Sequence, residues 1–118
     1  MEDLTIEAVR DYLQKNKLPL FAGQTEVSFP ILSRIHRRLK EGKRFSPILV
    51  DEDLIVNGHH RYICLNILNI EIEQLVWTSS PSSKSTCWTK IVVVENDWDT
   101  DEEKEIYRQR YDSNEITS

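Results

Sequence analysis

The sequence has no long hydrophobic segment and few cysteines. No stretch comes near the roughly 18 apolar residues that a transmembrane helix needs, and the chain begins with an acidic segment, Met1 to Leu4, where a secretory signal would be basic. Its two cysteines, Cys64 and Cys87, show no CxxC spacing and cannot form a framework of disulfides. We therefore expect a soluble, cytoplasmic protein with no membrane association, in which both thiols are structural.

The composition is that of one ordinary globular domain. The chain has 118 residues, enough for a single hydrophobic core. Hydrophobic residues make up 39% and charged residues 30%, values that favour neither wholesale disorder nor a fibrous protein. We find no internal repeat, and we expect residues 1–118 to form one domain.

Charge is divided by segment along the chain. Residues 34–44 contain six lysines and arginines and one acid, whereas residues 95–105 contain seven acids and one lysine. The net charge of −5 argues against nonspecific binding to nucleic acid over the whole surface, because such binding needs a concentrated positive face. The basic segment is suited to guide a phosphate-bearing ligand, and the acidic segment is suited to bind a basic protein surface.

Periodic apolar residues predict three helices outside the central part of the chain. Residues 5–16 follow a competent N-cap, Thr5, and residues 30–40 open with a proline and close before Gly42. The second of these helices carries much of the basic segment, and we expect His36 on its surface. Thr100 and Glu103 have the spacing of a capping box, which predicts a final helix.

The central part of the chain predicts a strand, a glycine turn and a helix. Short apolar runs at 48–50 and 54–56 are separated by an acidic turn and indicate a strand pair. Gly58 follows the second strand, and residues 60–69 return to helical spacing. Further strands are expected up to residue 77 and over residues 90–94, on either side of a serine-rich loop at 78–86. The order of elements predicts the α+β class, with a small mixed sheet and packed helices.

The glycine turn is the candidate functional site. A helix N-terminus presents unsatisfied backbone amides, and a glycine there lets an anion approach them closely. Arg61 lies in the first helical turn and is able to add a charge-assisted donor pair, while His59 and His60 are able to donate hydrogen bonds or exchange protons. A glycine before a helix also occurs as simple turn geometry.

The ordered pieces around this turn resemble a known superfamily. Pro47-Ile48-Leu49-Val50 followed by Ile55-Val56-Asn57-Gly58-His59-His60-Arg61-Tyr62 is similar to the core of ParB/sulfiredoxin proteins, in which a Pro-Ile-x-Val strand precedes a strand that ends in a GxxR turn. The resemblance covers about residues 27–77. It implies a ParB/sulfiredoxin-like fold and a turn that holds nucleotide phosphates through Gly58, His60 and Arg61.

The chain departs from that superfamily's enzymes at two positions. Sulfiredoxins carry a reactive cysteine directly after the glycine, where this chain has His59. Cys64 lies one helical turn beyond Arg61 and is expected to be packed. Small-molecule kinases of this fold commonly have an aspartate before the glycine, and Asn57 cannot replace it as a base or as an anionic metal ligand. ParB proteins add a helix-turn-helix region, for which no length remains.

These observations lead to a site prediction with alternatives left open. We expect Asn57, Gly58, His60, Arg61, Lys43 and Arg44 to bind a nucleoside triphosphate, with or without Mg²⁺, and His59, His60 and Arg61 to act on it in an NTPase or phosphotransferase reaction. One alternative is a small ParB-like nuclease or toxin module acting on nucleic acid, which the acidic net charge disfavours. Another is a non-enzymatic antitoxin or immunity-type protein that binds its partner through residues 95–105. Glu95 or Asp97 is a candidate Mg²⁺ ligand.

Overall fold

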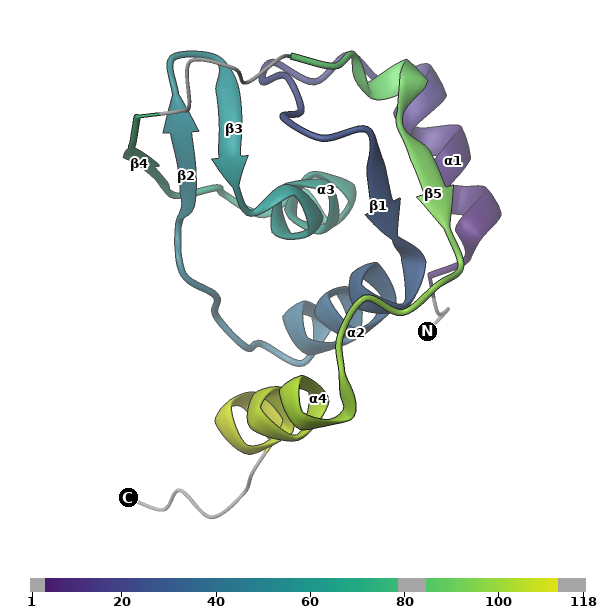
Figure 1. Ribbon diagram of the computed structural model, residues 1–118, viewed down its shortest axis with the longest axis vertical. Coiled ribbons are helices and arrows are strands. Elements are labelled where there is room, and N and C mark those ends of the chain that lie inside the picture. The colour runs from purple at the N-terminus through teal and green to yellow at the C-terminus, as the bar shows by residue number, and fades with distance from the viewer. Residues whose placement is uncertain (1–3, 79–84, 113–118) are drawn as a thin grey trace.

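The chain folds into helices packed around two small sheets (Figure 1), as the computed structural model describes for residues 4–78 and 85–112. The α+β class expected from the sequence is confirmed. In chain order the elements are α1 (Ile6–Lys15), β1 (Glu26–Ser28), α2 (Phe29–Lys40), β2 (Ile48–Asp51), β3 (Leu54–Asn57), α3 (His59–Ile67), β4 (Gln74–Val76), the 3₁₀ turn η1 (Trp88–Lys90), β5 (Val92–Val94), α4 (Asp101–Tyr107) and the π-helical turn η2 (Arg108–Asp112).

The helix ends follow the capping signals in the sequence. The Thr5 side chain accepts a hydrogen bond from the Ala8 amide, 3.1 Å away, at the start of α1. The predicted capping box opens α4, where Thr100 and Glu103 each accept a hydrogen bond from the other's amide. Each cap satisfies amide groups that the first helical turn leaves without partners. Local sequence therefore determines where these two helices begin.

The larger sheet contains the predicted strand pair, β2 and β3. Its order is β3-β2-β4, with β2 antiparallel to β3 and parallel to β4. Between β2 and β3 the chain reverses through Glu52, which has a positive φ of 56°. The sheet is therefore mixed, as expected, and β4 covers only part of the strand predicted up to residue 77. Because β4 is the last strand in the order, it forms one edge of the sheet.

The smaller sheet joins distant parts of the chain. β1 and β5 are parallel, with Val27 opposite Val93. No strand was predicted over residues 26–28, and the strand predicted from residue 90 begins only at Val92, after the η1 turn. Each strand has three residues, too few for a sequence period to identify it. This sheet brings the end of β1, and with it the start of α2, beside the segment that leads to α4.

The core surrounds α3. Tyr62, Ile63 and Cys64 are buried there among apolar side chains of α1, α2 and both sheets. Tyr62 stacks on Trp88 with ring centroids 5.6 Å apart. Both side chains also bind the backbone of Leu20: the Leu20 amide donates to Tyr62 Oη, and Trp88 Nε1 donates to the Leu20 carbonyl. The connector before β1 is thus held against the first turns of α3.

Two expectations about individual side chains were wrong. His36 was expected on the surface of the basic helix, but it is buried. The helix α2 packs along α3, and this packing covers a wider face of α2 than its apolar residues alone suggested. Cys87 was expected to be a structural thiol, but it lies exposed just before η1. Cys64 is buried as expected. Most of the predicted serine-rich loop, residues 79–84, lies outside the described residues.

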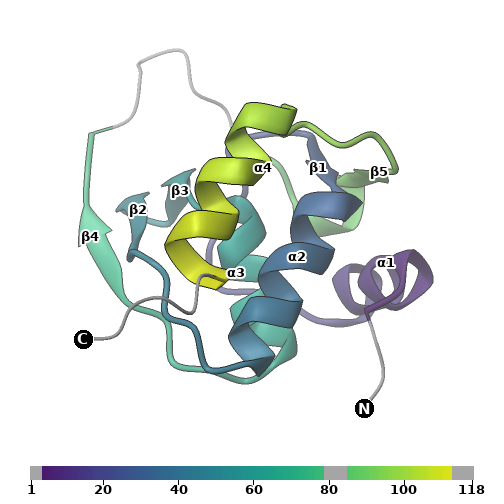
Figure 2. The same ribbon diagram turned by 90° about the horizontal axis from the view of Figure 1, so that it is seen from below.

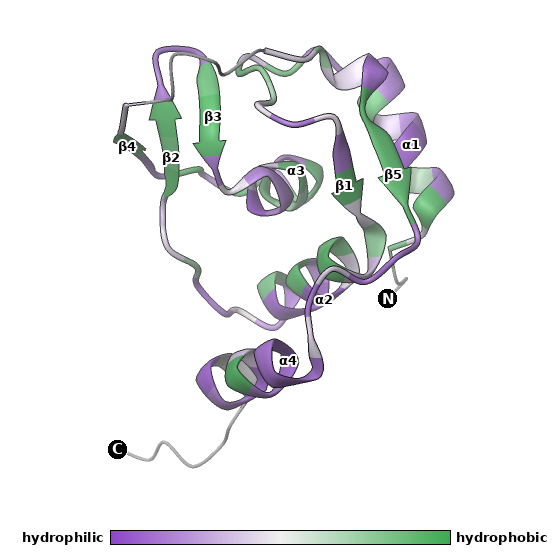
Figure 3. Cartoon of the chain, in the orientation of Figure 1, coloured by the Kyte–Doolittle hydropathy of each residue, from purple (hydrophilic) through white to green (hydrophobic). Residues whose placement is uncertain are grey.

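The described helices are shorter than a membrane-spanning segment. Among residues 4–78 and 85–112, no helix combines the length and apolar character needed to cross a membrane. The longest, α2, has 12 residues and carries four arginine and lysine side chains. Figure 3 shows the same mixture of hydrophilic and hydrophobic residues along α1 and α2, with α4 hydrophilic over most of its length.

Candidate anion-binding site

Gly58 makes the turn between β3 and α3 possible. Its backbone lies in the left-handed region, with φ 102° and ψ 26°, and it occupies the N-cap position of α3. A Cβ atom at this position would lie 2.6 Å from Ile48 Cγ2 and 2.8 Å from Arg61 Nη2. Both the conformation and the space therefore require glycine. The turn brings the first amides of α3 to the end of β3.

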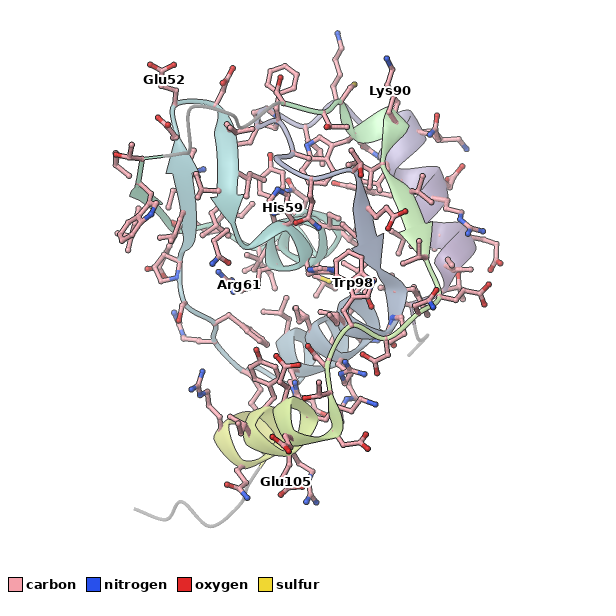
Figure 4. All side chains as sticks on the ribbon, in the orientation of Figure 1. Glu52, His59, Arg61, Lys90, Trp98 and Glu105 are labelled. Atoms are coloured by element: carbon pink, nitrogen blue, oxygen red, sulfur yellow. The ribbon has the colours of Figure 1, made fainter. Side chains whose placement is uncertain are left out.

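Arg61 folds back over the turn that precedes it. Its Nη2 atom lies near Gly58 and donates a long hydrogen bond of 3.4 Å to the carbonyl of Pro47, the residue before β2. In Figure 4 the Arg61 side chain lies on the side of α3 that faces α4. The guanidinium group is thus placed beside the helix N-terminus, where the positive end of the helix dipole and the cation act on the same space.

The two histidines use their Nε2 atoms to hold backbone. The Gly23 amide donates to His59 Nε2 at 2.8 Å, and the Ser28 amide donates to His60 Nε2 at 2.9 Å. An imidazole nitrogen that accepts a hydrogen bond is unprotonated, so each neutral ring carries its proton on Nδ1. Neither amide lies within α3, so the two rings fix α3 to the segment before β1 and to the junction of β1 and α2.

Burial keeps both histidines neutral. It lowers the pKa of His59 to about 4, and it lowers the pKa of His60 to about 4 with smaller contributions from His59 and Arg61. Desolvation disfavours the charged imidazolium, and neighbouring cations add to this effect. His60 also packs edge-on against Trp98, with ring centroids 5.4 Å apart. At neutral pH these rings are uncharged hydrogen-bond acceptors toward the backbone.

A cavity of about 490 Å³ opens in front of the glycine turn. It is enclosed by α2, α3, the segment before β2 and the C-terminal helical turns, and α4 lies beside α2 at this position (Figure 2). Four arginines line it, together with one carboxylate, two histidines, one phenylalanine, one tyrosine and several smaller side chains. The lining residues are Gln24, Ile31, Arg34, Ile35, Arg38, Phe45, Ser46, Val56, Asn57, Gly58, His59, His60, Arg61, Asp99, Tyr107 and Arg110.

An ion cluster holds the last segment against α2. Arg34 forms a two-fold hydrogen-bonded pair with Asp97, at 2.9 and 2.8 Å, and a third bond of 2.8 Å with Asp99. Lys104 of α4 lies 3.0 Å from Asp97 Oδ2. The hydrogen bonds from Arg34, followed by those from Lys104, hold the pKa of Asp97 well below its usual range. Part of the acidic segment is therefore paired with the chain's own basic segment.

Most of the predicted site residues meet at this cavity. Asn57, Gly58, His59, His60 and Arg61 all line it, whereas Lys43 and Arg44 are not among its lining residues. The chain instead contributes the next two residues, Phe45 and Ser46. The sequence indicated Arg34 and Arg38 only as part of the basic segment, and it gave no indication of Tyr107 and Arg110, which follow the acidic run.

The described residues provide no obvious metal centre. Within residues 4–78 and 85–112, no group of three or more histidine, cysteine, aspartate or glutamate side chains is arranged to hold a metal ion. Asp97, a candidate Mg²⁺ ligand by sequence, is occupied by Arg34 and Lys104, and Glu95 is exposed. A Mg²⁺ ion that arrives with a triphosphate takes most of its ligands from phosphate and water, so it needs few protein carboxylates.

Comparison with known proteins adds no relative. No family model, no curated protein and no solved structure matches the chain.

Proposed function

We propose that this chain is a ParB/sulfiredoxin-like domain that binds a phosphate-bearing ligand, a nucleoside triphosphate in the first instance, in the cavity in front of Gly58. The observation that carries the proposal is the convergence of a helix N-terminus and three arginines, Arg38, Arg61 and Arg110, on one cavity. A fourth lining arginine, Arg34, is bound to Asp97 and Asp99, and Asp99 is the one carboxylate that lines the cavity. Anions bind at helix N-termini because the amides and the helix dipole point toward them, and arginine is suited to phosphate oxygens.

The size and lining of the cavity suit a nucleotide. Its volume of about 490 Å³ falls within the range of about 300 to 1,000 Å³ typical of small-molecule sites. Phe45 and Tyr107 add aromatic surface at which a base is able to pack, while the arginines provide the charge for the phosphates. The arrangement of a Pro-Ile strand, a glycine turn and Arg61 agrees with what the resemblance implies for phosphate binding.

The proposal assigns ligand binding to the site and a supporting role to its histidines. A general base is most effective when its pKa lies near the working pH, and each histidine has a pKa of about 4. Their Nε2 lone pairs are also used by the amides of Gly23 and Ser28. His59 and His60 thus position the start of α3, and Arg61 is the residue of the turn that contacts the ligand.

A thermal-shift screen tests this proposal directly. A ligand that binds only the folded state raises its melting temperature, and the stabilisation grows with ligand concentration. The screen uses ATP, CTP, GTP and ADP at millimolar concentration, each with and without Mg²⁺, and sodium chloride at the same ionic strength as a control for simple salt effects. We expect at least one nucleotide to raise Tm by several degrees more than sodium chloride does. If all four nucleotides match the sodium chloride control, the nucleotide proposal is wrong.

A further inference from the structure

We infer that the outer edge of β4 is a docking site for an extended, basic segment of a partner protein, which adds to the larger sheet as a fourth strand. This surface consists of Gln74–Val76 and the flanking Trp77. It lies apart from the cavity, since none of these residues lines it. The inference therefore does not depend on the proposed nucleotide binding.

The backbone of β4 has unused hydrogen-bonding groups on one side. β2 pairs with it in register, Ile48 opposite Gln74 and Val50 opposite Val76. Hydrogen bonds at its ends run from the Ile48 amide to the Glu73 carbonyl and from the Trp77 amide to the Val50 carbonyl. In a parallel ladder alternate residues face the partner strand, so the amides and carbonyls of Gln74 and Val76 point away from β2. Among the described residues, no strand pairs with this edge.

The side chains of this edge are apolar and unusually exposed. Val76 is 91% exposed, Trp77 55% and Leu75 53%. Figure 2 shows β4 at the margin of the molecule. In Figure 3, where colour gives the hydropathy, the β4 arrow is coloured as hydrophobic. An uncovered edge strand with apolar side chains promotes pairing with another chain, and proteins usually protect such edges by keeping them very short or with lysine, proline or a bulge. β4 is short, with three residues, but it contains no lysine and no proline and has no bulge against β2.

Charge identifies the kind of segment that fits. Glu71 and Glu73 precede β4, and both are exposed. Past the other end of β4 lies the turn between β2 and β3, because Val76 is opposite Val50. This turn carries Glu52, which Figure 4 labels, and Asp53, and both are exposed. The sequence has no lysine or arginine from Asn69 to Thr78 or from Asp51 to Asp53. An apolar strand with lysine or arginine at each end is therefore complementary to the edge, whereas a second copy would bring only acids.

The test is NMR titration of the full ¹⁵N-labelled chain with defined peptides. The probe is a terminally blocked peptide, Lys-Thr-Val-Ile-Val-Thr-Lys, and its matched control replaces both lysines with glutamate. We expect the lysine peptide to shift the amide signals of Gln74 and Val76 and to slow their exchange with solvent. We expect its affinity at low salt to be about tenfold higher than that of the glutamate peptide, a difference of about 1.4 kcal/mol.

Two controls separate strand pairing from unspecific contact. Val76→Pro removes one outward amide and leaves the bonds to β2 unchanged, so we expect it to abolish binding, whereas Val76→Ala keeps the amide and binds. Should Val76→Pro fail to fold, the parent chain is titrated with a lysine peptide that is N-methylated at alternate residues, which cannot pair, and no shift is expected. Equal affinity for the lysine and glutamate peptides, or undiminished binding of the N-methylated peptide, overturns the inference. So does a parent chain that dimerises through this edge.

Discussion

The side chain of Ile48 lies directly against the backbone of Gly58. A Cβ atom at position 58 would approach Ile48 Cγ2 to 2.6 Å. The side chain of Ile48, the first residue of β2, thus limits how closely the turn between β3 and α3 approaches β2. This contact links the Pro-Ile segment and the glycine turn, two pieces that the sequence shows as separate signals, and it places the amides of α3 at the cavity.

Replacing Gly58 with alanine should destabilise the fold more than the same change at Gly42. Both glycines have positive φ, 102° and 88°, so both variants pay for a strained backbone, on the order of 1 to 2 kcal/mol. Only at Gly58 does the new Cβ also meet neighbours, because nothing lies within 4 Å at Gly42. Urea denaturation of the two variants measures the difference. Equal losses would show that the Ile48 contact is unimportant.

Stability should fall when the pH is lowered from about 6.5 to about 4. In this window the unfolded chain protonates His59 and His60, whose folded-state pKa values are about 4. The unfolded state then binds more protons, so stability is complete above the unfolded pKa and decreases below it, by up to about 1.4 kcal/mol per pH unit for each histidine.

Comparison with a non-titrating variant isolates this effect from the titration of carboxylates. In His60→Gln the side-chain amide oxygen is able to accept the Ser28 N–H without titrating. We expect the free energy of unfolding of this variant to depend less steeply on pH between 4 and 6.5 than that of the parent chain. Parallel profiles for the two proteins would show that His60 is not held neutral in the folded state.

Asp97→Asn should loosen α4 while leaving the rest of the domain folded. No residue of α4 is buried, so the ion cluster with Arg34 and Lys104 is a major tie between this helix and α2. A partly exposed pair of this kind contributes about 1 kcal/mol or less to global stability. Hydrogen exchange should therefore speed up in α4 but not in α3, with Glu102→Gln as the control on an exposed α4 carboxylate. Unchanged exchange in α4 would contradict the role of the cluster.

The two thiols should differ strongly in reactivity. Cys64 is fully buried and donates to the Leu32 carbonyl at 3.3 Å, and burial raises its pKa to about 12. Cys87 is exposed, and hydrogen bonds from Thr89 lower its pKa. Since the thiolate is the reactive form, iodoacetamide should modify one cysteine per native chain and two after denaturation. Rapid modification of Cys64 in the native protein would contradict this assignment.

Local signals in the sequence predicted much of the fold. The caps at Thr5 and Thr100, the strand pair around Asp51–Asp53 and the turn at Gly58 each depend on residues that are close together in the chain. The β1–β5 pair could not be predicted in this way, because each strand has three residues and the two are joined only through the tertiary fold. The burial of His36 also depends on a tertiary contact, the packing of α2 along α3, so the sequence indicated it as a surface residue.

The sequence predicted the residues of the glycine turn that line the cavity, but not the lining residues that come from other elements. Residues 57–61 all line the cavity, because the glycine turn itself places them there. Tyr107 and Arg110 line it from the C-terminal helical turns, which lie beside α2 through contacts between distant parts of the chain, such as the ion pair of Arg34 with Asp97. The histidines illustrate the limit most clearly. Their residue type suggested proton transfer, and the sequence could not show that their Nε2 atoms accept hydrogen bonds from the amides of Gly23 and Ser28, which come from another part of the chain.

The central claim is that Arg61 and the start of α3 bind phosphate, and calorimetric titration of Arg61→Ala tests it most directly. The ligand is the nucleotide that gives the largest thermal shift, and circular dichroism confirms that each variant is folded. Two variants serve as controls: Arg44→Ala removes a neighbouring cation that does not line the cavity, and Cys64→Ala removes a packed thiol. Both controls should bind the nucleotide nearly as well as the parent chain.

Arg61→Ala should lose about 1.5 to 3 kcal/mol of binding free energy, a tenfold or greater drop in affinity, because a charge-assisted hydrogen bond to phosphate is removed. An affinity for folded Arg61→Ala equal to that of the parent chain would contradict the account.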